Sequence, residues 1–329
     1  MVSNNLVNRV FSWLSHSTSL LFLAIAIGSV IGILSPAVGQ KSSEFTDPTI
    51  LVLVTLLLID IPIKGFLRGL SDIRFISIAW GINFVLIPSI GFVIASLFLS
   101  GQTLFFTGLI IYFMAPCTDW YLGFTKMAQG NVELGAVLLP INMLSQLLLF
   151  PICLYFFGTA ISYDVDFSMV IEWFVQPLLI AIILRLVFHR LMEPLLSVCR
   201  LSIPLVLALL VGQIFASNIN VLMGHIHVVP ILLLAIFVFF IITYLVSDII
   251  ARITKFEYPE HCLLSFTTGA RNAPLMLGLT TVAIPDQPLI YATITIGMLI
   301  EFPHLVTLKI ILLKRLHGKN MKPELSYFS

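Results

Sequence analysis

The chain has 329 residues, of which 59% are hydrophobic and only 10% are charged. Soluble globular proteins carry about 25% charged residues, so this composition excludes an ordinary water-facing surface. The formal net charge of +1 excludes a basic field for nucleic acid. Four cysteines are scattered in apolar runs without CxxC spacing, which argues against a disulfide scaffold or a zinc ribbon. We therefore expect an all-α, multi-pass protein of the lipid bilayer.

Apolar runs follow one another along almost the whole chain. A bilayer core of about 30 Å requires about 20 mostly apolar residues per helix. Ten runs meet this requirement, and their approximate bounds are 18–37, 47–63, 73–99, 103–126, 132–157, 167–188, 201–219, 226–249, 260–283 and 288–313. The sequence therefore predicts ten transmembrane helices.

The distribution of lysine and arginine supports this count. With ten spans, fifteen of the seventeen cations fall on the side that also holds both termini. Lys41 falls on the opposite side, and Arg271 lies within a span. Because cytoplasmic loops are enriched in cations, we expect both termini in the cytoplasm and the protein in the cell membrane.

Ten spans divide into two groups of five, 1–160 and 161–329. Two five-span units enter the membrane in opposite orientations, so a duplication would be inverted. The fourth and ninth spans are the most polar, and both contain a proline, Pro116 and Pro274. Proline removes a backbone donor and crowds the preceding turn, so both helices are expected to break there and to cross at the midplane.

Ionisable residues are rare within these spans and therefore informative. A charge at the bilayer centre costs about 2.5–3.5 kcal/mol even on the insertion scale. Asp119 follows Pro116 and Arg271 precedes Pro274, so these two charges are candidates to meet at the crossing; a purely structural pair is the alternative. The predicted substrate- or ion-binding residues are Cys117, Thr118, Asp119, Thr268, Arg271, Asn272 and Glu301.

Three amide side chains form a supporting polar set. Asn83 lies in the third span, and Asn142 and Gln146 lie in the fifth. Hydrogen bonding between helices is the favoured interpretation of all three. For Asp60, at the end of the second span, an interfacial role and a functional one are equally open.

No enzyme signature is present: the sequence lacks GxSxG, HExxH, a P-loop and a dinucleotide-binding GxGxxG followed by a suitable acid. The chain is therefore expected to be no enzyme and to need no cofactor or bound metal. Secondary transport, with Na+ or H+ as coupling ion, is the remaining interpretation.

Four patches resemble a known family. They are APCT at 115–118 with AQGNVEL at 128–134 and Asn142, the stretch from Asn83 to Pro88, GARNAPL at 269–275, and GMLIEFP at 297–303. These patches resemble the arsenite-efflux family within the bile acid/sodium symporter superfamily. The resemblance implies a ten-span core-and-panel fold whose broken fourth and ninth helices cross at the substrate site, and it places the family's thiol at Cys117. A thiolate is a suitable ligand for trivalent arsenic, although a buried cysteine can equally be an apolar filler.

Two departures from the family pattern affect the expected coupling. Leu275 stands where the arsenite exporters carry an acid, and Asp119 begins a stretch where the sodium symporters carry small polar residues. Neither usual ion site is complete, and Asp119 and Glu301 are the candidate replacements.

Three functions are therefore considered. The first is ion- or proton-coupled efflux of arsenite or a related small solute. The alternative is cation-coupled symport of an organic anion, with Arg271 as the anion anchor. A non-transporting membrane scaffold or sensor is disfavoured, because ionisable residues within spans are costly. Both a monomer and a homodimer are compatible with the sequence.

Overall fold

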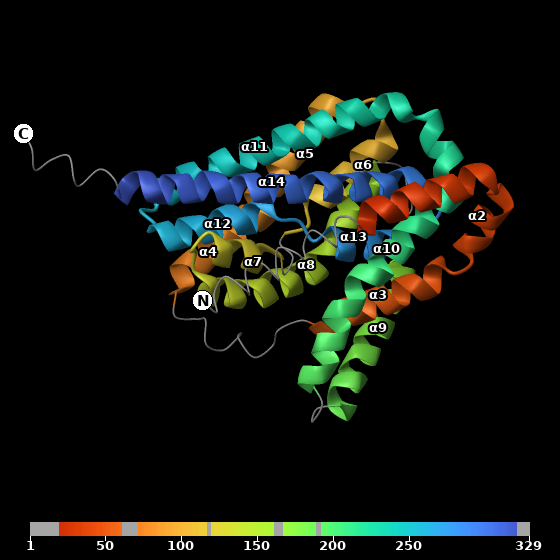
Figure 1. Cartoon of the computed structure of the whole chain (residues 1–329), viewed down its shortest axis with the longest axis horizontal. Helices are drawn as coiled ribbons and strands as arrows, with labels where there is room; N and C mark the ends of the chain where they lie inside the picture. Colours follow the sequence, from red (N-terminus) through yellow and green to blue (C-terminus); the bar gives the residue numbers. More distant parts are fainter. Residues whose placement is uncertain (1–19, 61–71, 117–119, 161–166, 189–191, 321–329) are drawn as a thin grey trace, which may run out of the picture.

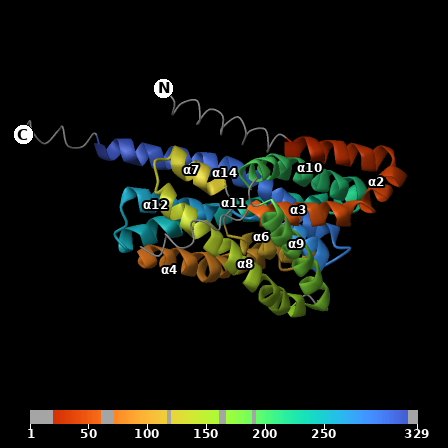
Figure 2. The same ribbon diagram turned by 90° about the horizontal axis from the view of Figure 1, so that it is seen from below.

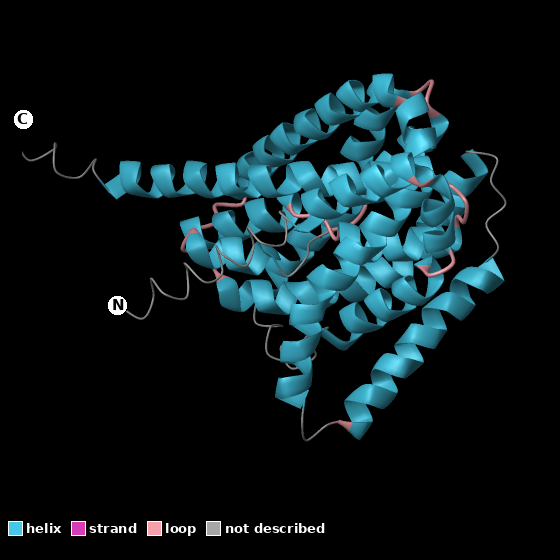
Figure 3. Ribbon diagram, turned by 45° about the vertical axis from the view of Figure 1, so that its right-hand side comes forward, coloured by secondary structure: helices cyan, strands magenta, loops and turns pink. Residues whose placement is uncertain are grey.

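The computed structural model describes residues 20–60, 72–116, 120–160, 167–188 and 192–320. These segments are helical apart from short connections, and they hold no β-strand (Figure 3). The helices are Leu20–Leu34, α2 (Pro36–Ser43), α3 (Thr46–Asp60), α4 (Ile73–Gly81), the π-helical η3 (Ile82–Leu86), α5 (Ile87–Leu99), α6 (Thr103–Phe113), α7 (Trp120–Met127), α8 (Val132–Ala160), α9 (Phe167–Val187), α10 (Met192–Gly224), the 3-10 segment η5 (Ile226–Val228), α11 (Val229–Ile253), α12 (Tyr258–Gly269), α13 (Ala273–Ala283) and α14 (Pro288–Asn320).

Among the described residues, five continuous helical segments are long and apolar enough to cross a membrane. They are Ile73–Leu99, Val132–Phe150, Pro194–Gly224, Ile226–Ile253 and Pro288–Leu316. A sixth arises if α2 and α3, which meet at an angle of 49°, form one bent span. α6 and α13 have 11 residues each, so each is about 16 Å long and too short to cross the bilayer core alone. The count of ten spans and the inverted repeat therefore remain predictions.

The helices pack in two groups. The helix Leu20–Leu34, α2, α3, α9 and α10 form the first, which we call the panel group. Its labelled members gather on the right-hand side of Figure 1, and Figure 2 again places α2, α3 and α10 together. The remaining helices form the core group. α13 packs against α3 and α9, and α14 packs against α10, so these two core helices lie at the boundary between the groups.

Glycines hold the first helix of the panel group directly against α10. A Cβ atom on Gly28 would lie 2.4 Å from the carbonyl oxygen of Gly212, and one on Gly32 would lie 2.4 Å from that of Ala216. Only a residue without a side chain allows such an approach. Small residues spaced by four positions are the usual means of close helix packing in membranes, and here they pack within one chain.

The outer helices and the segment 258–283 differ in how far their side chains are exposed. Large apolar side chains point outward from the long helices; Leu97 and Leu148 are both 75% exposed. An apolar exterior of this kind suits contact with lipid. In contrast, every residue from Cys262 to Ala273 is buried. The end of α12 and the start of α13 therefore lie at the centre of the helix assembly, enclosed on all sides.

Candidate functional site

The helical segments around Pro116 and Pro274 are both interrupted close to these prolines, as the sequence predicts. α6 ends at Phe113, before Pro116, and the helix resumes at α7. α12 ends at Gly269, and α13 carries Pro274 in its first turn. Proline is tolerated in a first helical turn because the N–H it lacks would have no intrahelical partner there. The two prolines thus mark helix breaks.

The two breaks meet in space. The backbones of Pro116 and Arg271 pair as an isolated antiparallel bridge. Beside this bridge the backbone N–H of Asn272 donates to the carbonyl oxygen of Ala115 at 3.0 Å. Peptide groups freed at one break are therefore satisfied by the other break, as a buried irregular backbone requires. We call this region the crossing.

Arg271 is fully buried at the crossing. Its Nη1 donates to the carbonyl oxygen of Phe113 at 2.8 Å, and its Nη2 donates to that of Thr268. These carbonyls lie in the last turns of α6 and α12, where they have no intrahelical partner and carry the partial negative charge of the helix ends. The guanidinium also lies over the ring of Phe239, 5.6 Å from its centroid, and Phe239 stacks on Phe113 at 3.7 Å.

Glu301 connects α14 to both breaks. Its Oε1 accepts a hydrogen bond from the backbone N–H of Arg271 at 2.9 Å, and its Oε2 accepts one from the hydroxyl of Tyr112 at 3.2 Å. The same hydroxyl lies 3.0 Å from the carbonyl oxygen of Gly297, one turn earlier in α14. The carboxylate is buried, and its two oxygens thus fix the position of the break between α12 and α13 relative to α6.

The three amides surround the same region and bond between helices. Asn83 and Asn142 both donate through Nδ2 to Oγ1 of Thr267, at 3.1 and 3.4 Å. Asn272 donates through Nδ2 to Oε1 of Gln146 at 3.5 Å. Among the described residues, Oδ1 of Asn83 and Nε2 of Gln146 have no hydrogen-bond partner. Buried polar atoms of this kind are rare, and each calls for an explanation.

Asn83 lies in the π-helical segment η3, and Pro88 is the second residue of α5, which follows η3 directly. Proline cannot donate to the carbonyl four residues earlier, and a wider turn accommodates that loss. The wider turn lies next to α12, against which η3 packs. A distortion before α5 thus accompanies the breaks between α6 and α7 and between α12 and α13.

The four other predicted binding residues are either outside the described structure or bonded within their own helix. Cys117, Thr118 and Asp119 lie outside the described residues, so the Asp119–Arg271 pair remains a prediction. The hydroxyl of Thr268 donates to the carbonyl oxygen of Leu264 in its own helix, at 2.9 Å, and only the backbone carbonyl of Thr268 is directed at Arg271.

Asp60 belongs to a contact within the panel group. It is buried and pairs with Arg200 of α10, with 2.7 Å between Nε and Oδ1. Nearby, Arg185 of α9 donates through Nε to the carbonyl oxygen of Ile59 at 3.1 Å. These contacts join α3 to α9 and α10.

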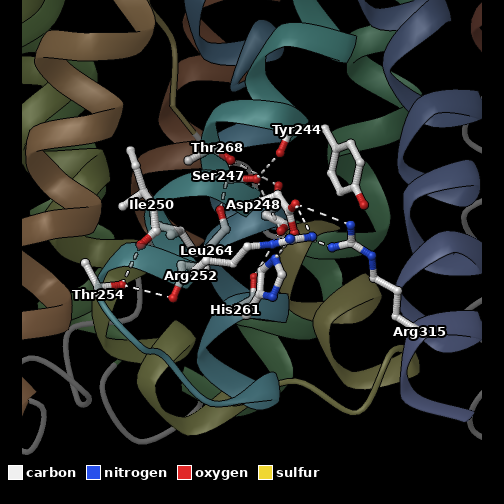
Figure 4. Close-up of polar contacts among 12 residues, drawn as sticks. Tyr244, Ser247, Asp248, Ile250, Arg252, Thr254, His261, Leu264, Thr268 and Arg315 are labelled. Atoms are coloured by element: carbon white, nitrogen blue, oxygen red, sulfur yellow. Dashed lines mark hydrogen bonds and ion pairs between the residues drawn. The ribbon is translucent and has the colours of Figure 1, made fainter. Parts of the chain in front are cut away.

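A second charged cluster, centred on Asp248, was not identified from the sequence (Figure 4). Its carboxylate contacts Arg315 of α14, Nη2 of Arg252 at 2.9 Å and Nε2 of His261 at 3.2 Å. Three elements, α11, α12 and α14, thus converge on one acid at the end of the core group that carries Arg252. The available signal was an aspartate near the end of an apolar run with an arginine four residues later.

Comparison with known proteins adds independent information. The family model of the Sodium Bile acid symporter family matches residues 48–242, from α3 into α11, which is more than half of the chain. No curated protein sequence matches. Members of the matched family are transporters and not enzymes. The arsenite-efflux subfamily is not confirmed, but the superfamily expected from the sequence is. The chain belongs to the sodium bile acid symporter family and is a multi-pass membrane protein.

Proposed function

We propose that the protein is a secondary active transporter that carries a small organic anion, with its substrate site at the crossing. The observation that carries this proposal is the antiparallel contact between the two helix breaks, where Arg271 and Asn272 meet Ala115 and Pro116. Binding sites built from discontinuous helices are a recurrent feature of secondary transporters. The family is named for sodium and bile acid symport, which supports an anionic cargo.

The chemistry of the crossing favours an anion. α7 and α13 both begin just beyond the breaks, and the N-terminus of a helix carries partial positive charge and free N–H donors. Nε2 of Gln146 is a buried donor without a partner among the described residues. A carboxylate could accept hydrogen bonds from such donors.

The two packing groups suggest how access alternates. α13 starts at the crossing and packs against α3 and α9 of the panel group. A relative movement of the panel and core groups would change which end of this boundary is open. We propose that the groups rock about the crossing, that two inverted five-span units underlie them, and that substrate and ion binding shift the populations of the two states.

Transport by the purified full-length protein in liposomes tests this proposal. Uptake of radiolabelled taurocholate and of a panel of short carboxylates is measured under imposed ion gradients. We expect gradient-dependent accumulation that Asn272→Ala abolishes. The matched control is Asn218→Ala on α10, because Asn218 donates to Ile214 of its own helix at 3.0 Å and should retain transport. No accumulation of any tested anion by the wild-type protein, or equal loss in both variants, contradicts the proposal.

Arsenite efflux is the second candidate, and one observation favours it. Pro116 lies at the crossing, and the next residue in the sequence is Cys117. A thiolate is a soft ligand of the kind that binds trivalent arsenic. Expression in an arsenite-sensitive host should then raise tolerance, and Cys117→Ala should remove the gain. Cys199→Ala, at a buried thiol of α10, is the matched control and should keep it; unchanged tolerance on wild-type expression excludes this candidate.

A further inference from the structure

The side chain of Arg271 occupies a position that is chemically suited to a cation. Its guanidinium binds one carbonyl from the last turn of α6, that of Phe113, and one from the last turn of α12, that of Thr268. Two half-helices thus direct the negative ends of their dipoles at the same group. In secondary transporters with discontinuous helices, C-terminal ends of half-helices and unwound carbonyls are the groups that coordinate the coupling cation.

We propose that Arg271 is a tethered cation that occupies the place of a coupling sodium ion between these helix ends, so that the protein moves its cargo without binding sodium at the crossing. This inference rests on the proposed transport function and specifies its coupling. It concerns a position within a family named for sodium symport, and it predicts that this member departs from the sodium dependence which that name describes.

The charge balance at the helix ends supports the view that the guanidinium of Arg271 takes the place of a sodium ion. Each helix C-terminus is equivalent to about half a negative elementary charge, so the ends of α6 and α12 together approximately balance one guanidinium. A sodium ion placed beside Arg271 would experience repulsion from a fixed positive charge in a buried region. Arginine keeps its proton in proteins, so this positive charge is permanent.

Several oxygen atoms of the described residues at the crossing already accept hydrogen bonds. The carbonyl of Ala115 accepts from Asn272 at 3.0 Å, and the two carboxylate oxygens of Glu301 accept from the Arg271 backbone and from Tyr112. A hard cation needs several oxygen ligands at once. Sodium would have to displace these donors. Oδ1 of Asn83 has no partner among the described residues, but one oxygen does not complete the coordination of a hard cation.

Covalent attachment distinguishes Arg271 from an ion. A coupling ion must bind on one side of the membrane and leave on the other, whereas a side chain stays in place throughout the cycle. The guanidinium therefore balances the ends of α6 and α12 in every state. The partial negative charges at the ends of α6 and α12 would otherwise repel each other, and Arg271 neutralises them whether or not an ion gradient is present.

Binding of radioactive sodium to the purified full-length protein tests the inference without any cargo. Equilibrium binding of 22Na+ is measured against excess unlabelled NaCl, with choline chloride at equal ionic strength as the reference. We expect no saturable binding by the wild-type protein and one sodium per chain in Arg271→Gln, which exposes the carbonyls of α6 and α12. Arg252→Gln is the matched control: this side chain is 68% exposed, and its loss should create no sodium site.

Saturable sodium binding by the wild-type protein would overturn the inference, and so would a folded Arg271→Gln variant that gains none. If Arg271→Gln does not fold, sodium binding is compared between the wild-type protein and Arg271→Lys, which retains a cation. Absence of sodium binding in both proteins supports the inference, and binding by either one overturns it. The outcome is separable from that of the transport proposal. Sodium binding by the wild-type protein would not contradict the proposal of anion transport. Failure to transport anions would not affect the interpretation of the sodium-binding measurement.

Discussion

Replacing Glu301 by alanine and by glutamine separates two roles of this side chain. In the structure Glu301 accepts one hydrogen bond from the backbone N–H of Arg271 and one from Tyr112. Alanine removes both acceptors. Glutamine keeps nearly the same volume and one acceptor oxygen, which can still face the Arg271 N–H. The difference between the two variants therefore reports on the acceptor that holds the break between α12 and α13, together with the cavity that alanine leaves.

The magnitude follows from the donors that each variant leaves unsatisfied. The hydroxyl of Tyr112 retains the carbonyl oxygen of Gly297 at 3.0 Å, so it does not become an orphan. The N–H of Arg271 does, and an unsatisfied buried donor costs about 1–3 kcal/mol. Glu301→Ala should therefore be less stable than Glu301→Gln by about 1–3 kcal/mol, plus the cost of the cavity that alanine leaves.

Thermal unfolding of the purified variants in one detergent checks this difference. Glu44→Ala is the control, because Glu44 is exposed at the end of α2, and it should match the wild-type protein. Equal midpoints for Glu301→Ala and Glu301→Gln would refute the reasoning, since the acceptor at Arg271 would then contribute nothing. A loss of stability in Glu44→Ala as large as that in Glu301→Ala would refute it as well.

Two further predictions concern helix packing and the second charged cluster. Gly28→Ala should lower stability by about 1–3 kcal/mol, because its methyl group would meet a backbone oxygen at 2.4 Å. The control Gly81→Ala, whose methyl group would have no atom within 4 Å, should be neutral or slightly stabilising. Equal melting midpoints for the two variants would contradict the packing argument. Asp248→Asn should cost about 1.5–3 kcal/mol through weakened bonds to charged partners. Arg252→Gln should cost less than about 1 kcal/mol, since that side chain is 68% exposed, and detergent melts that reverse this order would refute the central role of Asp248.

The helix breaks were located by prolines that stand among polar residues. Proline disturbs its own turn of backbone, but Pro177, Pro204 and Pro303 lie inside continuous helices. The polar residues beside Pro116 and Pro274 were therefore the additional signal. The amides were also interpretable, because a buried amide in an apolar span needs a partner on another helix. Asn83 and Asn142 do bond between helices, and both converge on Thr267.

The partners of the charged groups could not be derived in the same way. Tyr112, Arg271 and Glu301 are separated by 159 and 30 positions, and only the packing of α6 against α14 brings them together. The carbonyl contacts of Arg271 depend on where two helices end in space. Asp248 was overlooked because its three partners lie on three elements, of which only Arg252 is close in sequence.

The length of α14 has a mechanical consequence. Its 33 residues extend over about 50 Å, well beyond a bilayer core of about 30 Å, and Figure 1 shows it reaching past the end of α12. Glu301 and Arg315 lie on this one helix, about 21 Å apart along its axis. Pro303 lies inside the helix between these two residues, so the segment lacks one backbone hydrogen bond but remains helical. The buried carboxylate at the crossing and the ion pairs of Asp248 are therefore attached to the same helix, and a displacement of α14 would change both sites together.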